Sequence, residues 1–227
     1  MNFLESSFNS VTELSSSQPM GFVIACLISL AITPFIKERA SMLQLVDRGE
    51  GRAYPNIPRL GGIAILIALI STIGFYLIVY GRYTPSGVKH LELEGMIAGA
   101  LIIFFIGLFD DLKPIPAPIK LAGQVLAAVT AWLMNVRIEF LANPIHYIDH
   151  ARIAAVPLDD IASLITTVIF MVAITNAINL IDGIDGLAVG VTIICCAASW
   201  AINLSPILNQ PAGAILAATL AGACFGF

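Results

Sequence analysis

Long apolar runs without charged residues are the feature that most constrains this chain. Of its 227 residues, 58% are hydrophobic and only 11% are charged, whereas a soluble domain is typically about 25% charged. A helical membrane span needs about 20 mainly apolar residues. Because backbone polar groups in lipid must be satisfied within the protein, such runs predict helices rather than open sheets. We therefore predict an all-α, polytopic transmembrane helical bundle.

Seven runs approach or meet the length of a span. They are Met20–Ile36, Gly61–Tyr80, Leu93–Phe109, Leu121–Val136, Ile161–Ile181, Leu187–Leu204 and Ala212–Phe227. Residues 1–18 are Ser-rich and contain no Lys or Arg, so they lack the basic region of a secretory signal. We expect a polar tail over 1–18 and a single transmembrane domain over 19–227.

The distribution of Lys and Arg predicts the orientation. With the N-terminus outside, seven basic residues fall in inner loops and four in outer loops, and the first inner loop alone holds five. Cytoplasmic loops carry the excess of basic residues in membrane proteins. We therefore expect the N-terminus to lie outside the cytoplasm.

This orientation places three polar groups of residues on the cytoplasmic side. The first is Asp110-Asp111, at the inner end of the third run, followed by Lys113 and Lys120. Carboxylates beside an apolar helix are costly unless they are paired or bind a cation. Mg²⁺ is usually held by one or two carboxylates together with substrate phosphates. A metal and phosphate site and a simple pairing with the two lysines both remain open.

The second group is Asn176-x-x-Asn179-x-x-Asp182-Gly183-Ile184-Asp185-Gly186. Residues three apart lie near one helix face, so Asn176 and Asn179 point roughly together. The two Asp-Gly pairs indicate a turn that ends the helix, which places Asp182 and Asp185 on a tight loop. Four polar side chains in an apolar region favour a functional site over a plain hydrophilic reversal.

The third group is the inner loop from Val46 to Gly62, with Asp47, Arg52 and Arg59. Arg59 is suited either to bind a phosphate or to anchor the loop at lipid headgroups. Gly61-Gly62 predicts close helix packing at the start of the second run.

The remaining polar and sulfur residues indicate no other chemistry. The four cysteines fall in apolar runs without metal-binding spacing, and no basic patch suggests nucleic acid. His90, His146 and His150 fall in outer segments, away from the inner carboxylates. Asp159 and Asp160 precede the fifth run, where a helix N-terminus favours acidic residues. No charged residue follows Leu187, so we expect a further C-terminal part of the protein.

These motifs resemble those of the polyprenyl-phosphate N-acetylhexosamine-1-phosphate transferases. Asn176 to Ala188 is similar to the family's Asn-Asp-Gly motif, and Asp110 to Lys113 with Lys120 and Gln124 is similar to its aspartate-rich loop. Leu45 to Arg48 with Pro58 to Gly62 is similar to its first cytoplasmic loop. Family members are about half as long again and carry a later Gly-Asp motif and a His-containing loop, which this chain lacks.

The resemblance implies a multi-pass protein of the bacterial cytoplasmic membrane, with its active site on the cytoplasmic face. It would transfer N-acetylhexosamine-1-phosphate from a UDP-sugar to polyprenyl phosphate and release UMP. Mg²⁺, or Mn²⁺, would be the cofactor, and a homodimer is compatible with the family. The resemblance implies that Asp110, Asp111 and Asp182 are catalytic and hold the metal. It also implies a substrate-binding set comprising Asn176, Asn179, Asp185, Lys113, Lys120 and Arg59.

Three alternatives stay open from the sequence. A secondary transporter also holds polar residues in broken helices, but near the bilayer midplane and often in inverted repeats. A non-catalytic scaffold gives no reason for the inner aspartates and asparagines. The chain is also compatible with an inactive portion of the transferase.

Overall fold

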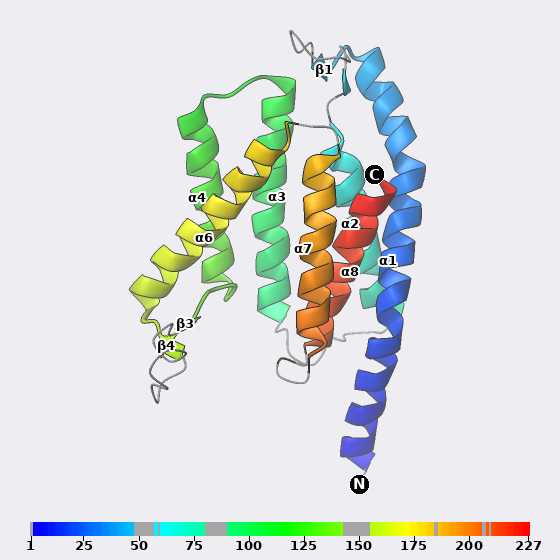
Figure 1. The fold of residues 1–227 in the computed structure, drawn as a ribbon, viewed down its shortest axis with the longest axis vertical. Coiled ribbons are helices and arrows are strands. Elements are labelled where there is room, and N and C mark those ends of the chain that lie inside the picture. Colours follow the sequence, from blue (N-terminus) through cyan, green and yellow to red (C-terminus); the bar gives the residue numbers. More distant parts are fainter. Residues whose placement is uncertain are drawn as a thin grey trace. The chain divides into compact units, whose positions relative to one another are not determined.

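The computed structural model describes residues 2–47, 57–58, 60–79, 90–142, 155–183, 186–205, 208 and 210–227. Within these residues the chain is built from seven helices and two short ladders of strands (Figure 1). The helices are α1 (Asn2–Met42), α2 (Gly62–Val79), α3 (His90–Leu112), α4 (Ala117–Leu133), α6 (Asp160–Ile181), α7 (Leu187–Asn203) and α8 (Pro211–Gly226). The all-α class predicted from the sequence is confirmed.

Four of these helices are long and apolar enough to cross a membrane. The candidate spans are Gln18–Met42, Gly62–Val79, Leu91–Leu112 and Asp160–Ile181. The other three, α4, α7 and α8, are apolar but shorter. At 1.5 Å per residue they reach about 25 Å, somewhat less than the roughly 30 Å hydrocarbon core. The seven predicted runs are therefore all helices, four of them of spanning length.

The first helix is much longer than its apolar run. We predicted a span over Met20–Ile36, but α1 extends from Asn2 to Met42 and includes the residues assigned to the polar tail. Residues 2–17 contain no Gly or Pro, so no residue there breaks the helix once the apolar segment has formed it. An apolar run marks the part of a helix that can enter lipid, but it does not mark the residues at which the helix begins and ends.

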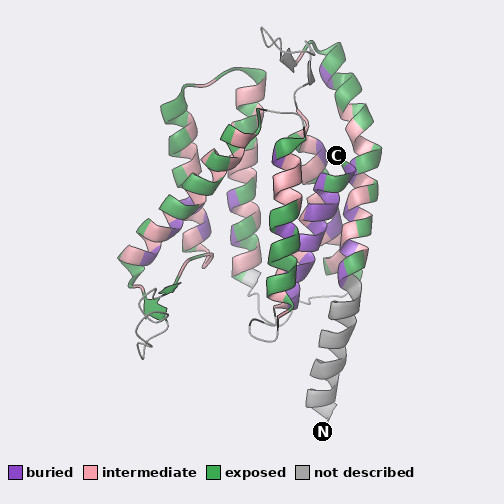
Figure 2. Cartoon of the chain, in the orientation of Figure 1, coloured by how far each residue is buried: buried purple, intermediate pink, exposed green. Residues whose placement is uncertain are grey.

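The chain divides into two compact units, each described here by itself. One comprises residues 1–89 and 182–227 and contains α1, α2, α7 and α8. In it α8 lies along α1 and also packs against α7 and α2. Ala25, Ala68 and Ala223, none of them exposed, meet at the centre of this unit. Figure 2 shows α8 buried along most of its length. Small side chains let these helices approach closely.

The second unit, residues 90–181, contains α3, α4 and α6. Helix α4 packs against both α3 and α6. Ala127, Ala128 and Ala131 form the buried face of α4. On α6 a stripe of isoleucines, Ile161, Ile165 and Ile169, is 71%, 54% and 63% exposed. A contiguous exposed apolar stripe of this kind suits lipid rather than water.

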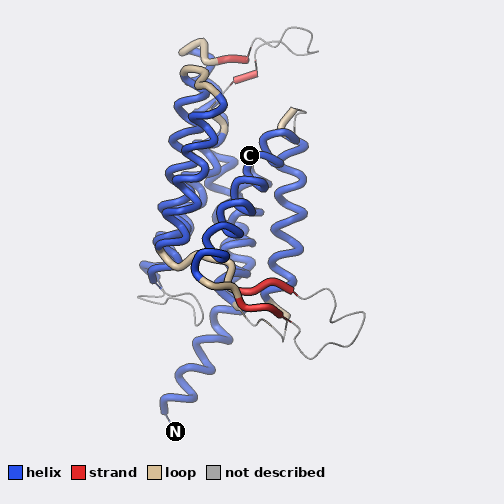
Figure 3. Tube along the Cα trace, turned by 90° about the vertical axis from the view of Figure 1, so that its left-hand side faces the viewer, coloured by secondary structure: helices blue, strands red, loops and turns tan. Residues whose placement is uncertain are grey.

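Two short antiparallel ladders join the helices, and the sequence did not reveal them (Figure 3). The strands β1 (Val46–Asp47) and β2 (Ile57–Pro58) pair within the loop between α1 and α2. The strands β3 (Phe140–Ala142) and β4 (Ala155–Pro157) pair between α4 and α6. Strands of two or three residues are too short for an alternating pattern to show.

Candidate active site

The predicted site residues of the second unit gather at one end of its three helices. The chain runs along α3, back along α4 and again along α6 (Figure 1). The last turn of α3, the first turn of α4 and the last turns of α6 therefore share this end, which we call the polar end. It contains Asp110, Asp111, Lys113, Lys120, Asn176 and Asn179. The structure therefore brings the first group and the two asparagines to the same end of this unit. Their place on the cytoplasmic side of a membrane stays a prediction.

Asp110 is held by two partners at the polar end. Its Oδ2 lies 2.6 Å from the Nζ of Lys120. Its Oδ1 accepts a hydrogen bond of 3.0 Å from the backbone N–H of Ile115, in the turn between α3 and α4. The side chains of Lys120 and Asp110 are 36% and 30% exposed, so the pair is partly screened by solvent. Asp110 therefore fixes the turn and the position of Lys120.

Asp111 and Lys113 belong to the same turn at the end of α3. Asp111 is half-buried, and Lys113 is exposed. The C-terminus of a helix carries partial negative charge, so two carboxylates in the last turn of α3 are unfavourable without compensation. Nearby ammonium groups supply part of that compensation, and a bound cation would supply more.

One turn deeper, an amide pair links α4 and α6. The Nδ2 of Asn176 donates to the Oε1 of Gln124 over 2.7 Å and to the backbone oxygen of Val172 over 2.8 Å. Both side chains are half-buried. Asn179, one turn further along α6, is exposed. In the sequence, Gln124 stands out only as part of a motif. Its contact with Asn176 joins residues 52 positions apart, so local spacing carries no signal for it.

Other predicted site residues belong to the first unit or lie outside the described residues. Asp182 is exposed at the end of α6 and is grouped with the first unit. Gly186, at a φ of 77°, begins α7 in the left-handed conformation that glycine tolerates. Asp185 and Arg59 lie outside the described residues. The arrangement of Asp182 with Asp110 and Asp111 stays a prediction.

The residues after Arg59 differ in how closely they are packed. Leu60 adopts a φ of 75°, which is uncommon for a branched side chain. Gly61 faces the ring of Phe227, and a Cβ there would lie 2.5 Å from its Cζ. Gly62 has open space around it. The predicted close packing is therefore confirmed for Gly61 and is wrong for Gly62, because that residue faces away from other atoms.

The donor chemistry of the polar end fits a magnesium ion. Among the described residues, no three His, Cys, Asp or Glu side chains come together as a ready-made metal cage. Mg²⁺ does not need such a cage, since one or two carboxylates and substrate phosphates normally hold it. Asp110 and Asp111 are adjacent carboxylates in a turn that also carries two lysines. They are suited to a hard cation shared with phosphate oxygens.

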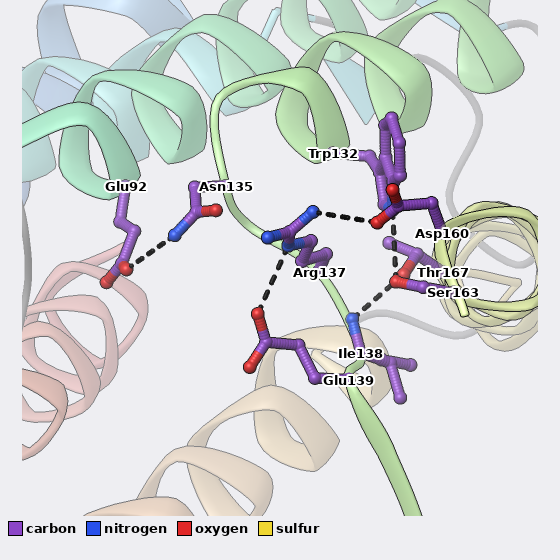
Figure 4. Close-up of polar contacts among 9 residues, drawn as sticks. All are labelled: Glu92, Trp132, Asn135, Arg137, Ile138, Glu139, Asp160, Ser163 and Thr167. Atoms are coloured by element: carbon purple, nitrogen blue, oxygen red, sulfur yellow. Dashed lines mark hydrogen bonds and ion pairs between the residues drawn. The ribbon is translucent and has the colours of Figure 1, made fainter. Parts of the chain in front are cut away.

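The opposite end of this unit has a different character (Figure 4). Arg137 lies between Glu139, at 3.2 Å, and Asp160, at 3.5 Å, and 5.8 Å from the ring of Trp132. The indole N–H of Trp132 donates to the Oγ of Ser163 over 3.1 Å. The arginine is thus matched by two carboxylates and an aromatic face. This network is structural and attaches the start of β3 to α6.

Two further hydrogen bonds lie at the same end. Asn135 donates to Glu92 over 3.1 Å, and the backbone N–H of Ile138 donates to Thr167 over 2.9 Å (Figure 4).

The start of α6 is capped by Asp159. The Oδ1 of Asp159 accepts a 2.7 Å hydrogen bond from the backbone N–H of Ala162. The prediction that a helix N-terminus explains this acidic pair is confirmed for Asp159. His90 also lies at this end, at the start of α3, and His146 and His150 lie outside the described residues.

The polar end thus offers carboxylate, ammonium and amide groups, which suit a metal ion and phosphate oxygens, on helices that are otherwise apolar. The model of glycosyl transferase family 4 matches residues 93–227. The chain belongs to this family. That match covers α3 to α8, and therefore every described residue of the polar end.

Relatives with assigned activities agree with this membership. A Bacillus subtilis protein described as a probable undecaprenyl-phosphate N-acetylglucosaminyl 1-phosphate transferase is 31% identical over 77% of this chain and 45% of its own length. The decaprenyl-phosphate N-acetylglucosaminephosphotransferase of Mycobacterium tuberculosis is 30% identical over 89% of this chain and 51% of its own. The phospho-N-acetylmuramoyl-pentapeptide-transferase of Clostridioides difficile is 29% identical over 96% and 66%. The chain spans about half the length of the first two relatives.

Proposed function

We propose that this protein transfers N-acetylhexosamine-1-phosphate from a UDP-sugar to polyprenyl phosphate in the bacterial cytoplasmic membrane. The relatives act on polyprenyl phosphates and N-acetylglucosamine phosphate donors according to their names. The observation that carries the proposal is the polar end, where Asp110 of α3 pairs with Lys120 of α4 and Gln124 of α4 pairs with Asn176 of α6. A polyprenyl phosphate would approach such a site within its own leaflet, with its chain in the hydrocarbon and its phosphate at the interface.

In the proposed reaction, an oxygen of the polyprenyl phosphate forms a bond to the sugar-linked phosphorus. The bond from that phosphorus to the bridging oxygen breaks, and UMP leaves with that oxygen. Negative charge gathers on the phosphate oxygens, so catalysis depends on positioning and on matched positive charge. Lys113, exposed beside the turn, would contact a phosphate. Lys120, fixed by Asp110, would hold its ammonium group in a constant place.

Mg²⁺, or Mn²⁺ in its place, would neutralise the pyrophosphate when bound. Asp110, Asp111 and Asp182 are the residues we propose to hold it. Asp110, which contacts Lys120 and the backbone N–H of Ile115, would also organise the turn that carries Asp111.

Asp185, Asn179 and Arg59 would complete the substrate-binding set on the cytoplasmic side. The proposed product is a polyprenyl-diphosphate sugar, the first membrane intermediate of a cell-envelope polysaccharide such as the O-antigen. A homodimer is compatible with this function.

UMP release by membranes containing the protein tests the proposal. The reaction would contain UDP-GlcNAc, undecaprenyl phosphate and Mg²⁺, and Asp111→Asn should lower the rate about 100-fold or more. Asp160→Asn is a matched control, since it makes the same change on a side chain that is 85% exposed at the opposite end. Equal rates for the wild type and Asp111→Asn would contradict the assignment of Asp111.

A further inference from the structure

The amide pair Asn176–Gln124 carries an inference about which substrate Asn176 meets. Gln124 follows Lys120 by one helical turn on α4, so both lie on the same face of that helix. Lys120 pairs with Asp110 on α3, and Gln124 pairs with Asn176 on α6. Helix α4 thus contacts α3 through Lys120 and α6 through Gln124. The contact of Gln124 lies one helical turn further from the polar end than that of Lys120.

The hydrogen bonds fix the orientation of the Asn176 amide. The backbone oxygen of Val172 can only accept, so the nitrogen of Asn176 must face it, at 2.8 Å. The 2.7 Å contact to Gln124 comes from the same nitrogen, so Gln124 must present its oxygen. The carbonyl of Val172 thus determines which atom of the Asn176 amide is the nitrogen and, through it, which atom of the Gln124 amide is the oxygen. Both amide hydrogens of Asn176 are therefore used within the protein.

An amide with both hydrogens used offers a ligand only its carbonyl oxygen. That oxygen can accept a hydrogen bond or contact a cation, but it cannot hydrogen-bond to an unprotonated phosphate oxygen, which is itself an acceptor. Of the two proposed substrates, the polyprenyl phosphate consists of hydrocarbon and phosphate and is essentially an acceptor. The UDP-sugar carries hydroxyl groups, an acetamido N–H and an imide N–H, all of them donors.

We infer that Gln124 is a positioning residue that makes Asn176 an acceptor-only group and so commits it to the UDP-sugar rather than to the lipid phosphate. The inference rests on the proposed function for its choice of substrates. Without Gln124, one amide hydrogen of Asn176 is released and the amide can rotate away from Val172. The site then loses a fixed acceptor for the sugar nucleotide while its lysines and carboxylates stay in place.

Equilibrium binding of radiolabelled UDP-GlcNAc to the purified chain in nanodiscs tests this without requiring turnover. Gln124→Leu should weaken binding about threefold or more, the size expected for one interhelical hydrogen bond. Gln124→Glu keeps an acceptor oxygen at the same reach and should restore most of the affinity. Binding of undecaprenyl phosphate, measured in parallel, should change less than about twofold for both variants.

A double-mutant cycle tests whether the side chains of Gln124 and Asn176 interact in the folded protein. Thermal unfolding of Gln124→Leu, Asn176→Leu and the double variant should be non-additive, because the two side chains share one bond. Additive effects on unfolding would overturn the inference. So would a Gln124→Leu variant that binds the lipid more weakly but UDP-GlcNAc as well as the wild type does. A wild type that does not bind UDP-GlcNAc would overturn it too. UDP-GlcNAc binding with the expected pattern but no transfer would support the inference and count against the proposed reaction.

Discussion

The close approach of α1 and α8 provides a sharp test of the packing described here. Gly222 and Gly226, one turn apart on α8, both face the backbone of α1. A Cβ on Gly222 would collide with the carbonyl oxygen of Phe22 and lie 2.8 Å from its carbonyl carbon. Backbone atoms cannot move aside by changing a rotamer, so Gly222→Ala must push the two helices apart.

The expected cost follows from overpacking in a filled interface. Extra methyl groups in well-packed cores typically cost about 1–3 kcal/mol, so we expect Gly222→Ala to lower the free energy of unfolding by about 2 kcal/mol. For a chain of this size, that corresponds to a midpoint about 4–8 °C lower. Thermal unfolding of the purified protein in detergent, followed by circular dichroism, measures the shift.

Gly190→Ala provides the matched control. Gly190 lies within α7, and a Cβ there would meet no atom within 4 Å. The same substitution should be neutral or should stabilise the helix by up to about 1 kcal/mol, because alanine is the better helix former. Equal destabilisation by both variants, or none by either, would refute the proposed backbone contact between α1 and α8.

Three further predictions concern the two ends of the second unit. Lys120→Met should change the free energy of unfolding by no more than about 1 kcal/mol, because the pair of Lys120 with Asp110 is partly exposed. The same substitution should lower the rate of UMP release at least about tenfold. Unfolding and rate measurements on one preparation check both effects. Trp132→Phe removes the bond to Ser163 and should cost about 1 kcal/mol without lowering UMP release per folded protein, since it lies at the opposite end. EDTA should abolish UMP release and excess Mg²⁺ should restore it, whereas activity that persists in EDTA would contradict a metal-dependent reaction.

The helices were predictable because lipid imposes a simple rule on the sequence. The predicted run Gly61–Tyr80 differs from α2 by one residue at each end, and Ile161–Ile181 differs from α6 by one residue. In each case a glycine, proline or acidic cap marks the boundary. The start of α1 was not predictable, because polar residues without a helix breaker neither favour nor forbid a longer helix.

The candidate site was predictable in its residue types and only partly in its contacts. Alternation of helix direction was enough to place Asp110 and Asn176 at the same end. The pairing of Asp110 with Lys120 was one of the two possibilities that the sequence left open. The bond between Gln124 and Asn176 depends on how α4 and α6 rotate about their axes. Helix packing sets such rotations, and the positions involved carry no sign of polar function. Ala127 and Ala131 of α4, for example, lie against Gly99 of α3.

The central claim is that a phosphorylated sugar moves as one group onto a membrane lipid. The most direct test uses UDP-GlcNAc labelled with ¹⁴C in the sugar and ³²P at the sugar-linked phosphorus, incubated with membranes containing the protein, undecaprenyl phosphate and Mg²⁺. We expect both labels to enter the organic phase together in a constant ratio and unlabelled UMP to remain in water. Sugar label without phosphorus label in the lipid, or neither label across several UDP-N-acetylhexosamines, would contradict it.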